Sequence, residues 1–291
     1  MKNYRAILVG NGTMGKRHRL RFETSGVEFV CTIDSDCENL ADEQLDCLDF
    51  AVVASPATTH YKYVRFFLSH KVPVLVEKPL ATSVAEAQGL LNLSKQYDTL
   101  LFVAHSECYN PLFLDFRRRF LRDVESFRAC CENKGMKSHC NEGICLEFRR
   151  EHGHSERCHD VDVSHDLLVH DLSLFLNMFC MKDIRVVEKN LGTDESLMRL
   201  RVVRGPYAGI EAFFYVNRES HRDVRTVSAL FPKAGYTASL VNYDKSLNVM
   251  HISDSLDNEH RFFLRLLNRC SDKWALRAAE SAVDVLQLIE S

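Results

Sequence analysis

The chain has 291 residues, of which 46% are hydrophobic and 26% charged, and its formal net charge is −3. This composition is typical of a globular protein of one or two domains, and it argues against a disordered chain or a basic nucleic-acid-binding protein. No apolar run reaches the roughly 20 residues that cross a bilayer, and no signal-peptide core is visible, so we expect a cytoplasmic protein without membrane contact. The 11 cysteines include no C-x-x-C pair, which fits reduced thiols.

Short apolar runs alternate with helical patterns from Tyr4 to about Arg122. Strands that are apolar throughout and separated by helices indicate a parallel sheet with helices on both faces. We therefore predict a doubly wound α/β domain over residues 1–122. The connection between Asp34 and Asp49 is short, so we expect a trimmed helical crossover there. The predicted strands are RAILV, VEFVCTI, FAVVA, VPVLV and TLLFVA.

The first predicted strand runs directly into a glycine-rich turn with the pattern G-x-G-x-x-G. The first glycine permits a tight turn, the second lets the backbone approach a pyrophosphate, and the third lets the next helix pack closely on the strand. The second strand ends in Asp34, near where an acid binds the ribose hydroxyls. We predict a dinucleotide site here; the alternative is a purely structural turn. Its predicted residues are Gly10, Gly12, Thr13, Met14, Gly15 and Asp34.

The residues after the second strand bear on the choice of dinucleotide. Asp34 is followed by Asp36, and no Lys or Arg lies between or immediately after them. Two carboxylates repel a 2′-phosphate, so the sequence favours NAD over NADP. An arginine from elsewhere in the chain would reverse this preference.

An acid, a base and a proline follow the fourth predicted strand as Glu77, Lys78 and Pro79. Ligands of doubly wound sheets bind at the carboxyl ends of the strands, so this corner is expected to lie beside the dinucleotide. An ammonium group there could stabilise negative charge on a substrate oxygen. The alternative is a solvated turn that ends in a proline.

Four stretches together resemble the Gfo/Idh/MocA family of NAD(P)-dependent dehydrogenases, which act mostly on sugars and related polyols. They are G-x-G-x-M-G-x-R-H, SPATTH, VEKPLATSVAEA and VAHSECYNP. The resemblance implies that Lys78 lies near the nicotinamide and the reacting hydroxyl, and that Glu77 helps to hold the nicotinamide ribose. It further implies a cis Lys78–Pro79 bond. The residues it places along the cofactor are Ser55, Pro56 and His60.

The pattern changes after Arg122, where strand-like runs follow one another without intervening helices. Such a succession indicates a largely antiparallel open sheet, so we predict an α+β domain over residues 123–291 that binds substrate. Family resemblance implies homodimers or homotetramers through this sheet. Two helical patterns close the chain. The predicted strands are VESFRACCE, ICLEFRR, DIRVVEK, LMRLRVV, GIEAFFYV, RTVSALF, YTASLV and SLNVMHI.

A helix predicted over residues 163–179 carries a second candidate site. Asp166, His170, Ser173 and Asn177 recur on one stripe, and histidine suits proton transfer near neutral pH. On spacing alone, an amphipathic helix with a wet face is the favoured explanation of this pattern. The stretch D-L-L-V-H-D-L resembles the family's substrate-domain motif, which implies that Asp166 and His170 face the nicotinamide.

Further stretches resemble the UDP-N-acetylglucosamine 3-dehydrogenase-like branch of the family. VAHSECYNP is similar to its G-H-x-E-R-F-N-P motif, which implies a substrate site bordered by His105, Glu107, Tyr109 and Asn110. The chain departs from the motif at Cys108, where that branch has an arginine. If that arginine holds a polar group of the substrate, the substrate here differs.

The segment from 130 to 170 is dense in cysteine and histidine. Thiolate and imidazole are the usual zinc ligands, but the spacing fits no standard site and the family is not metal-dependent, so we expect no metal. The alternative to zinc is a polar substrate loop. The residues concerned are Cys140, Cys145, His152, His154, Cys158, His159 and His165.

These observations predict an NAD-dependent oxidoreductase that transfers a hydride between a secondary hydroxyl of a sugar, such as C3 of UDP-N-acetylglucosamine, and nicotinamide. His170 is the expected base, Lys78 polarises the same oxygen and Asp166 orients the sugar or the imidazole. Two alternatives remain open. One is a dehydrogenase or reductase of a cyclic diol or a tetrapyrrole, and the other is a non-catalytic regulator that senses the dinucleotide.

Overall fold

The computed structural model describes residues 4–34, 45, 47–133, 141–153, 160–241, 254–267 and 273–291. Within it, the chain forms two compact units. The first contains residues 1–106 and 256–290, and the second contains residues 107–255 and residue 291.

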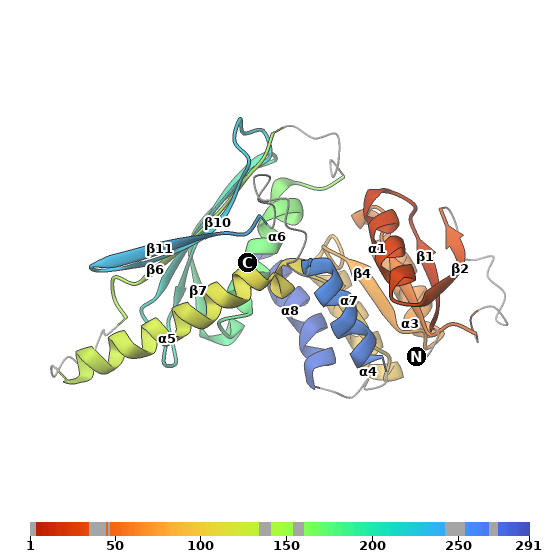
Figure 1. Ribbon diagram of the computed structural model, residues 1–291. Coiled ribbons are helices and arrows are strands. Elements are labelled where there is room, and N and C mark those ends of the chain that lie inside the picture. The colour runs from red at the N-terminus through yellow and green to blue at the C-terminus, as the bar shows by residue number, and fades with distance from the viewer. Residues whose placement is uncertain are drawn as a thin grey trace. The chain divides into compact units, whose positions relative to one another are not determined.

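The first unit contains a sheet that includes β1, β2 and β4 (Figure 1). Its five strands follow the order β2-β1-β3-β4-β5, and every neighbouring pair is parallel. This confirms the predicted doubly wound sheet. The predicted crossover between Asp34 and Asp49 falls largely outside the described residues. The strands are β1 (Tyr4–Val9), β2 (Val27–Ile33), β3 (Phe50–Val53), β4 (Val74–Glu77) and β5 (Leu101–Ala104).

Helices cover both faces of this sheet because its strands are apolar on both sides. On one face, Val9, Val53 and Val76 pack in a core with residues of α3 (Ala57–Ser69), α4 (Val84–Tyr97) and α8 (Lys273–Glu290). On the other face, Phe50 and Phe102 contact Phe263 of α7 (Ser255–Leu266), and Phe50 also contacts Phe22 of α1 (Thr13–Thr24).

The two closing helices differ from the sequence prediction, which placed them in the second domain. α8 packs on α4 and β5, and α7 packs on the aromatic face, so both belong to the first unit. The first unit also ends at residue 106, not at 122. The apolar faces of these helices pack on a sheet whose last strand, β5, lies far earlier in the chain. The hydrophobic period of a helix predicts that it has a buried face, but it does not predict which sheet that face covers.

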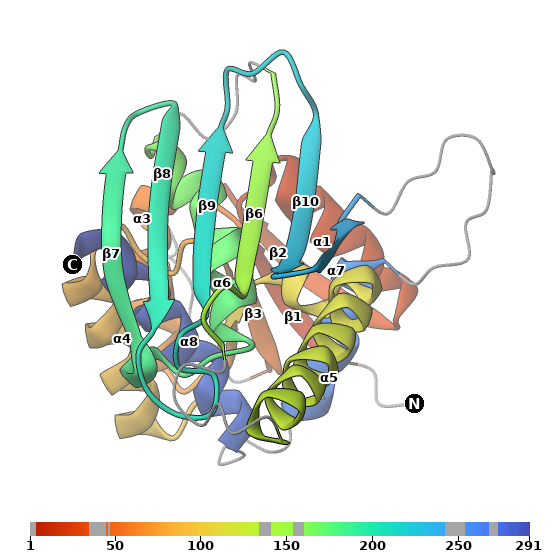
Figure 2. The same cartoon turned by 90° about the vertical axis from the view of Figure 1, so that its left-hand side faces the viewer.

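Six strands form the sheet of the second unit, in the order β11-β10-β6-β9-β8-β7 (Figure 2). Only β6 and β9 run parallel among these neighbours, so the predicted largely antiparallel α+β unit is confirmed. The predicted strand SLNVMHI lies outside the described residues. The strands are β6 (Cys145–Glu151), β7 (Ile184–Leu191), β8 (Glu195–Val202), β9 (Glu211–Asn217), β10 (Val224–Phe231) and β11 (Ala234–Ser239).

One predicted strand, VESFRACCE, is wrong: it forms the second half of helix α5 (Pro111–Asn133). Phe113, Phe116, Phe120 and Val124 are the buried residues of this helix, and they recur at the helical period. The i,i+4 ion pair between Arg119 and Asp123 supports the same conformation. The strand prediction rests on the short run V-E-S-F alone and does not take into account the charged helical sequence before it.

The helix predicted over residues 163–179 forms as a π-helical turn, η3 (Ser164–Leu168), followed by α6 (Val169–Leu176). Phe175 of α6 contacts Phe148 of β6 and Phe214 of β9 edge-on, and those two rings stack at 4.8 Å. The helix therefore covers one face of the sheet. The short 3-10 helices η2 (Ser106–Tyr109) and η4 (Met181–Asp183) complete the described elements.

No described helix is long and apolar enough to cross a membrane.

Candidate active site

The carboxyl ends of all five strands of the first unit lie in one row. Val9 pairs with Ile33 and with Val53, Val53 pairs with Val76, and Val76 pairs with Val103. The residues that follow this row are therefore brought to one edge of the sheet. They are Gly10, Asp34, Ala54, Glu77 and Ala104. The first unit thus gathers most of its predicted site residues at a single edge.

The glycine turn connects β1 to α1 at this edge. Gly10 has φ +91°, and a Cβ added to it would lie 2.5 Å from the carbonyl oxygen of Ala54. A Cβ on Gly15 would overlap the carbonyl oxygen of Gly10, whereas a Cβ on Gly12 would meet nothing within 4 Å. Two glycines therefore permit close packing, and Gly12 leaves its backbone open. Because α1 begins at Thr13, its first N–H groups point to this open space.

Asp34 lies at the end of β2 with an exposed side chain. Its Oδ1 accepts a hydrogen bond of 2.9 Å from the backbone N–H of Asn11 in the glycine turn. The carboxylate is therefore held beside the turn and remains accessible, which is the arrangement needed to bind ribose hydroxyls.

The corner after β4 holds a buried carboxylate next to a half-buried ammonium group. Glu77 is 9% exposed, and the Lys78–Pro79 peptide bond is cis. Oε1 of Glu77 lies 2.8 Å from Nε2 of His18, and Oε2 accepts the backbone N–H of Lys78 at 3.2 Å. Burial raises the pKa of Glu77, but the hydrogen bond with His18 and the electrostatic interactions with His18, Lys78 and His60 outweigh it and lower that pKa overall. Glu77 is thus ionised at neutral pH.

His60 joins this corner to the turn after β3. Its Nδ1 lies 2.7 Å from the carbonyl oxygen of Pro79, and its Nε2 lies 2.9 Å from that of Ser55. The ring is 1% exposed. Both neighbours accept hydrogen bonds only, so the imidazole can donate to both only when it carries two protons. His60 therefore fixes two strand-end corners against each other and leaves neither ring nitrogen for a cofactor.

His105 follows β5 and is 6% exposed. Neither ring nitrogen has a hydrogen-bond partner among the described residues. Burial and the charge of Lys78 lower the pKa of His105 to about 4, against a smaller opposite effect of Glu77. The ring is therefore neutral at pH 7, with one donor and one acceptor available for a ligand.

These features fit a bound dinucleotide. Gly12 leaves open space where a pyrophosphate would lie, and Asp34 offers an exposed carboxylate. Buried polar atoms without partners are rare in folded proteins, so the two nitrogens of His105 indicate a ligand.

Asp166 and His170 lie in the second unit, on η3 and α6. Asp166 is 7% exposed and His170 is half-buried. The alternative of a wet helix face does not describe this stripe, because Ser173 is 1% exposed and donates a hydrogen bond of 2.7 Å to the carbonyl of His170. π-Helical turns occur frequently at functional sites. The approach of these two residues to Lys78 stays a prediction.

Glu107 and Asn110, predicted at the substrate site, bind other parts of the second unit. Oε1 of Glu107 lies 2.7 Å from Arg225 and 3.5 Å from Arg150, and Arg150 pairs with Asp171 at 2.7 Å. Nδ2 of Asn110 donates to Glu107 and to the carbonyl of Leu240. Burial raises the pKa of Glu107, and both arginines more than reverse this. Arg149 and Arg150 lie on β6, within the predicted strand ICLEFRR, and Arg150 is 3% exposed.

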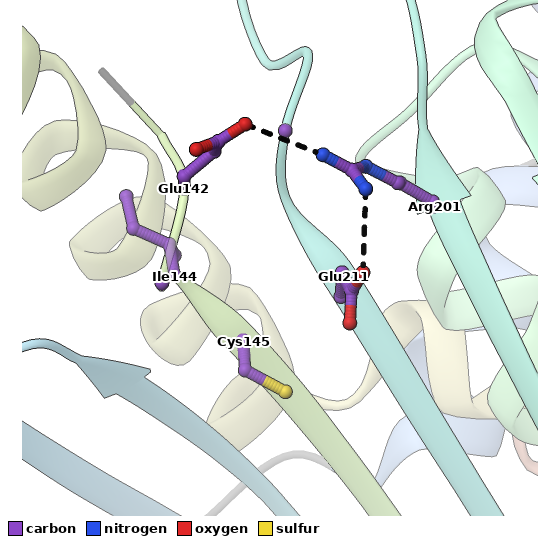
Figure 3. A pocket seen from close by; sticks show the side chains of 7 residues that line it. Glu142, Ile144, Cys145, Arg201 and Glu211 are labelled. Atoms are coloured by element: carbon purple, nitrogen blue, oxygen red, sulfur yellow. Dashed lines mark ion pairs between the residues drawn. The ribbon is translucent and has the colours of Figure 1, made fainter. Parts of the chain in front are cut away.

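A surface pocket of about 420 Å³ lies elsewhere in the second unit (Figure 3). Arg201 there pairs with Glu142 at 3.6 Å and with Glu211 at 3.7 Å. Burial and two nearby carboxylates raise the pKa of Cys145 to about 12, so its thiol is protonated and unreactive. The pocket therefore offers neither a free charge nor a nucleophile. It is lined by Glu142, Gly143, Ile144, Cys145, Arg201, Gly209 and Glu211.

No three described His, Cys, Asp or Glu residues are grouped so that they could hold a metal ion. Four members of the cysteine- and histidine-rich segment, Cys140, His154, Cys158 and His159, lie outside the described residues.

Sequence reasoning missed two residues next to the site, His18 and His260. His18 is the last residue of the motif G-x-G-x-M-G-x-R-H, so this motif could have identified it. His260 is 242 positions further along the chain, and no motif marks it.

Residues 16–105 match the family described as "Oxidoreductase family, NAD-binding Rossmann fold", abbreviated GFO_IDH_MocA. A local match to the uncharacterized oxidoreductase YgjR of Escherichia coli is 35% identical over 68 residues, and spans 23% of this chain and 21% of that protein.

Two relatives with longer matches are named as dehydrogenases. UDP-N-acetylglucosamine 3-dehydrogenase of Acidithiobacillus ferrooxidans is 23% identical over 246 residues, covering 74% of this chain and 72% of that protein. Inositol 2-dehydrogenase 2 of Mycolicibacterium vanbaalenii is 25% identical over 241 residues, covering 73% and 67%. The solved structure of the first enzyme, GnnA, has a TM-score of 0.74 at 18% identity and covers 99% of this chain and 97% of its own, which shows the shared fold.

Proposed function

Because the chain belongs to the Gfo/Idh/MocA family of NAD(P)-binding oxidoreductases, we propose that it is a dehydrogenase that oxidises a secondary hydroxyl of a sugar. The observation that carries the proposal is the single row of strand ends that gathers the glycine turn, Asp34, the Glu77–Lys78 corner and His105. The nicotinamide, when bound, supplies the hydride chemistry. The remaining task of the protein is to hold the substrate and move one proton.

The charges at this edge suit a dinucleotide and an alcohol. Gly12 and the start of α1 receive the phosphates, Asp34 binds the adenosine ribose, and ionised Glu77 accepts hydrogen bonds from the nicotinamide ribose. Residues Thr13, Met14, Ser55 and Pro56 line the same path. The exposed carboxylate of Asp34 favours NAD over NADP.

Lys78 and His170 share the proton chemistry in this proposal. The ammonium group of Lys78 stabilises the alkoxide that develops as the hydride leaves, and the imidazole of His170 accepts the hydroxyl proton. Asp166 orients that imidazole or the sugar. Neutral His105, together with Tyr109, binds the sugar hydroxyls through its two unused ring nitrogens.

The similarity to UDP-N-acetylglucosamine 3-dehydrogenase supports a nucleotide sugar oxidised at C3. Cys108 replaces the arginine of that motif, and its thiol lies 3.5 Å from the hydroxyl of Ser173, so this position offers no positive charge to the substrate. A second substrate class is a cyclic polyol, which the similarity to inositol 2-dehydrogenase favours.

The outer face of the second unit's sheet supports a homo-oligomer. Leu197 of β8, Phe213 of β9 and Leu230 of β10 lie on this face and are 37–38% exposed. Homodimers or homotetramers would bury these side chains.

The experiment is a panel of nucleotide sugars, free sugars and inositols incubated with NAD or NADP, with turnover followed at the absorbance of the reduced cofactor. Lys78→Met should lower turnover on the active substrate by about 10²–10³-fold, because it removes a charge that stabilises the developing alkoxide, while NAD still binds. Lys62→Met, an exposed lysine on α3, is the matched control and should keep wild-type turnover. Full turnover by Lys78→Met would contradict the assigned role. Tight NAD binding without turnover on any substrate would favour the regulator.

A further inference from the structure

Three side chains from distant parts of the first unit form a buried chain of hydrogen bonds. Nε2 of His260 on α7 lies 2.7 Å from Nδ1 of His18 on α1, and Nε2 of His18 lies 2.8 Å from Oε1 of Glu77 at the end of β4. His18 is 0% exposed and His260 is 1% exposed. The chain therefore leads from the helix that covers the sheet to the carboxylate at the cofactor edge.

The surroundings fix the ring of His260. It stacks on Phe22 with a centroid distance of 3.7 Å and an interplanar angle of 8°. Its Nδ1 has no hydrogen-bond partner among the described residues. A buried N–H without an acceptor costs more free energy than a bare ring lone pair, so the proton of neutral His260 is on Nε2.

This assignment determines the direction of both hydrogen bonds in the series from His260 to Glu77. His260 donates from Nε2 to Nδ1 of His18, so His18 in turn donates from Nε2 to Glu77. Burial is the largest of the effects that lower the pKa of His260 to about 2, followed by its electrostatic interactions with His18 and Arg21, which agrees with a neutral terminal ring. With the backbone N–H of Lys78, Glu77 then has one donor on each oxygen and keeps lone pairs for a ligand.

We propose that His260 and His18 are positioning residues, which hold Glu77 ionised and in one orientation through a chain of donated hydrogen bonds. The effect on the cofactor rests on the proposed function, in which Glu77 receives ribose hydroxyls. The tautomers themselves do not depend on it. A carboxylate held by a buried donor loses less conformational freedom when a ligand binds, which increases affinity.

The first test is a nitrogen-15 NMR measurement of the imidazole tautomers in the cofactor-free, wild-type protein. The expected result is His260 protonated at Nε2 only and His18 protonated at Nε2, with its Nδ1 as acceptor. His260 protonated at Nδ1 would overturn the proposal. This readout is independent of activity, so it is informative even if the protein binds neither NAD nor NADP, a result that would end the proposed function instead.

The second test compares two substitutions of His260. His260→Phe keeps the stack on Phe22 but removes the donor, and we expect about fivefold weaker NADH binding, with His18 in a mixture of tautomers. His260→Gln keeps an N–H donor near the position of Nε2 and should restore affinity to within about twofold. Equal NADH affinities of the Phe and Gln variants would show that the ring only fills space. Thermal unfolding of both variants verifies that the comparison uses folded protein.

Discussion

In the proposed function, the carboxylate of Asp34 favours NAD over NADP. Asp34→Ala removes the carboxylate that is held beside the glycine turn by the N–H of Asn11. We expect NAD affinity to fall roughly tenfold to hundredfold, because a charged acceptor for two hydroxyls is lost, while NADP affinity stays the same or increases. Isothermal titration with each dinucleotide measures both constants.

Glu28→Ala is the matched control for this prediction, since Glu28 is another exposed carboxylate on β2. It should leave both affinities unchanged. A parallel loss of NAD and NADP affinity in Asp34→Ala would place the carboxylate outside the ribose site.

At this scale the sequence predicted the local features well and the distant contacts poorly. The glycine turn, Asp34 and the Glu77–Lys78 corner are short segments whose chemistry and strand-end placement follow from motif and periodicity, and the cis Lys78–Pro79 bond is confirmed. The hydrogen bond between His18 and His260 joins residues 242 positions apart, and no local sequence pattern predicts this contact.

Between elements, the buried ion pair of Arg150 with Asp171 joins β6 to α6 and also reaches Glu107. Arg150→Met leaves the carboxylate of Asp171 buried without its partner and leaves Glu107 paired with Arg225 alone. We expect the free energy of unfolding to fall by about 3–5 kcal/mol, as urea denaturation would measure.

The adjacent Arg149→Met supplies the control on the same strand. The side chain of Arg149 is 48% exposed, and its partner Glu151, which is 4% exposed, also accepts a hydrogen bond from Ser220. Loss of the Arg149 side chain should cost at most about 1 kcal/mol. Equal losses for the two variants would contradict the claim that burial of Arg150 makes this pair important.

Helices and strands were predicted correctly where a single hydrophobic period, helical or alternating, continued through the whole element. Apolar strands alternating with helices gave the parallel sheet, and alternating strands gave the mixed one. The error at VESFRACCE arose because two β-prone residues, Val124 and Phe127, lie inside a helix whose buried positions begin at Phe113. The π-helical turn at Asp166 also had no sequence signal, since an inserted residue does not change the local composition.

At the level of the whole molecule, periodicity could not assign the closing helices to a unit. α8 carries Ala279, Val283 and Leu286 on its buried face, and these complete a core begun by β1 and β3 at the other end of the chain. The packed fold determines which apolar helix face covers which sheet. The division of the chain into units therefore required the structure.

We propose above all that this chain transfers a hydride from a sugar carbon to nicotinamide, and that Lys78 stabilises the alkoxide that develops during the transfer. The most direct measurement is deuterium transfer: UDP-N-acetylglucosamine, free sugars and inositols deuterated on their ring carbons are each incubated with NAD, and the reduced cofactor is analysed by mass spectrometry. The account predicts deuterium on the nicotinamide for at least one substrate with the wild-type protein, and a loss of about 10²–10³-fold in Lys78→Met. Absence of label from every substrate, or equal transfer by the variant, would contradict it.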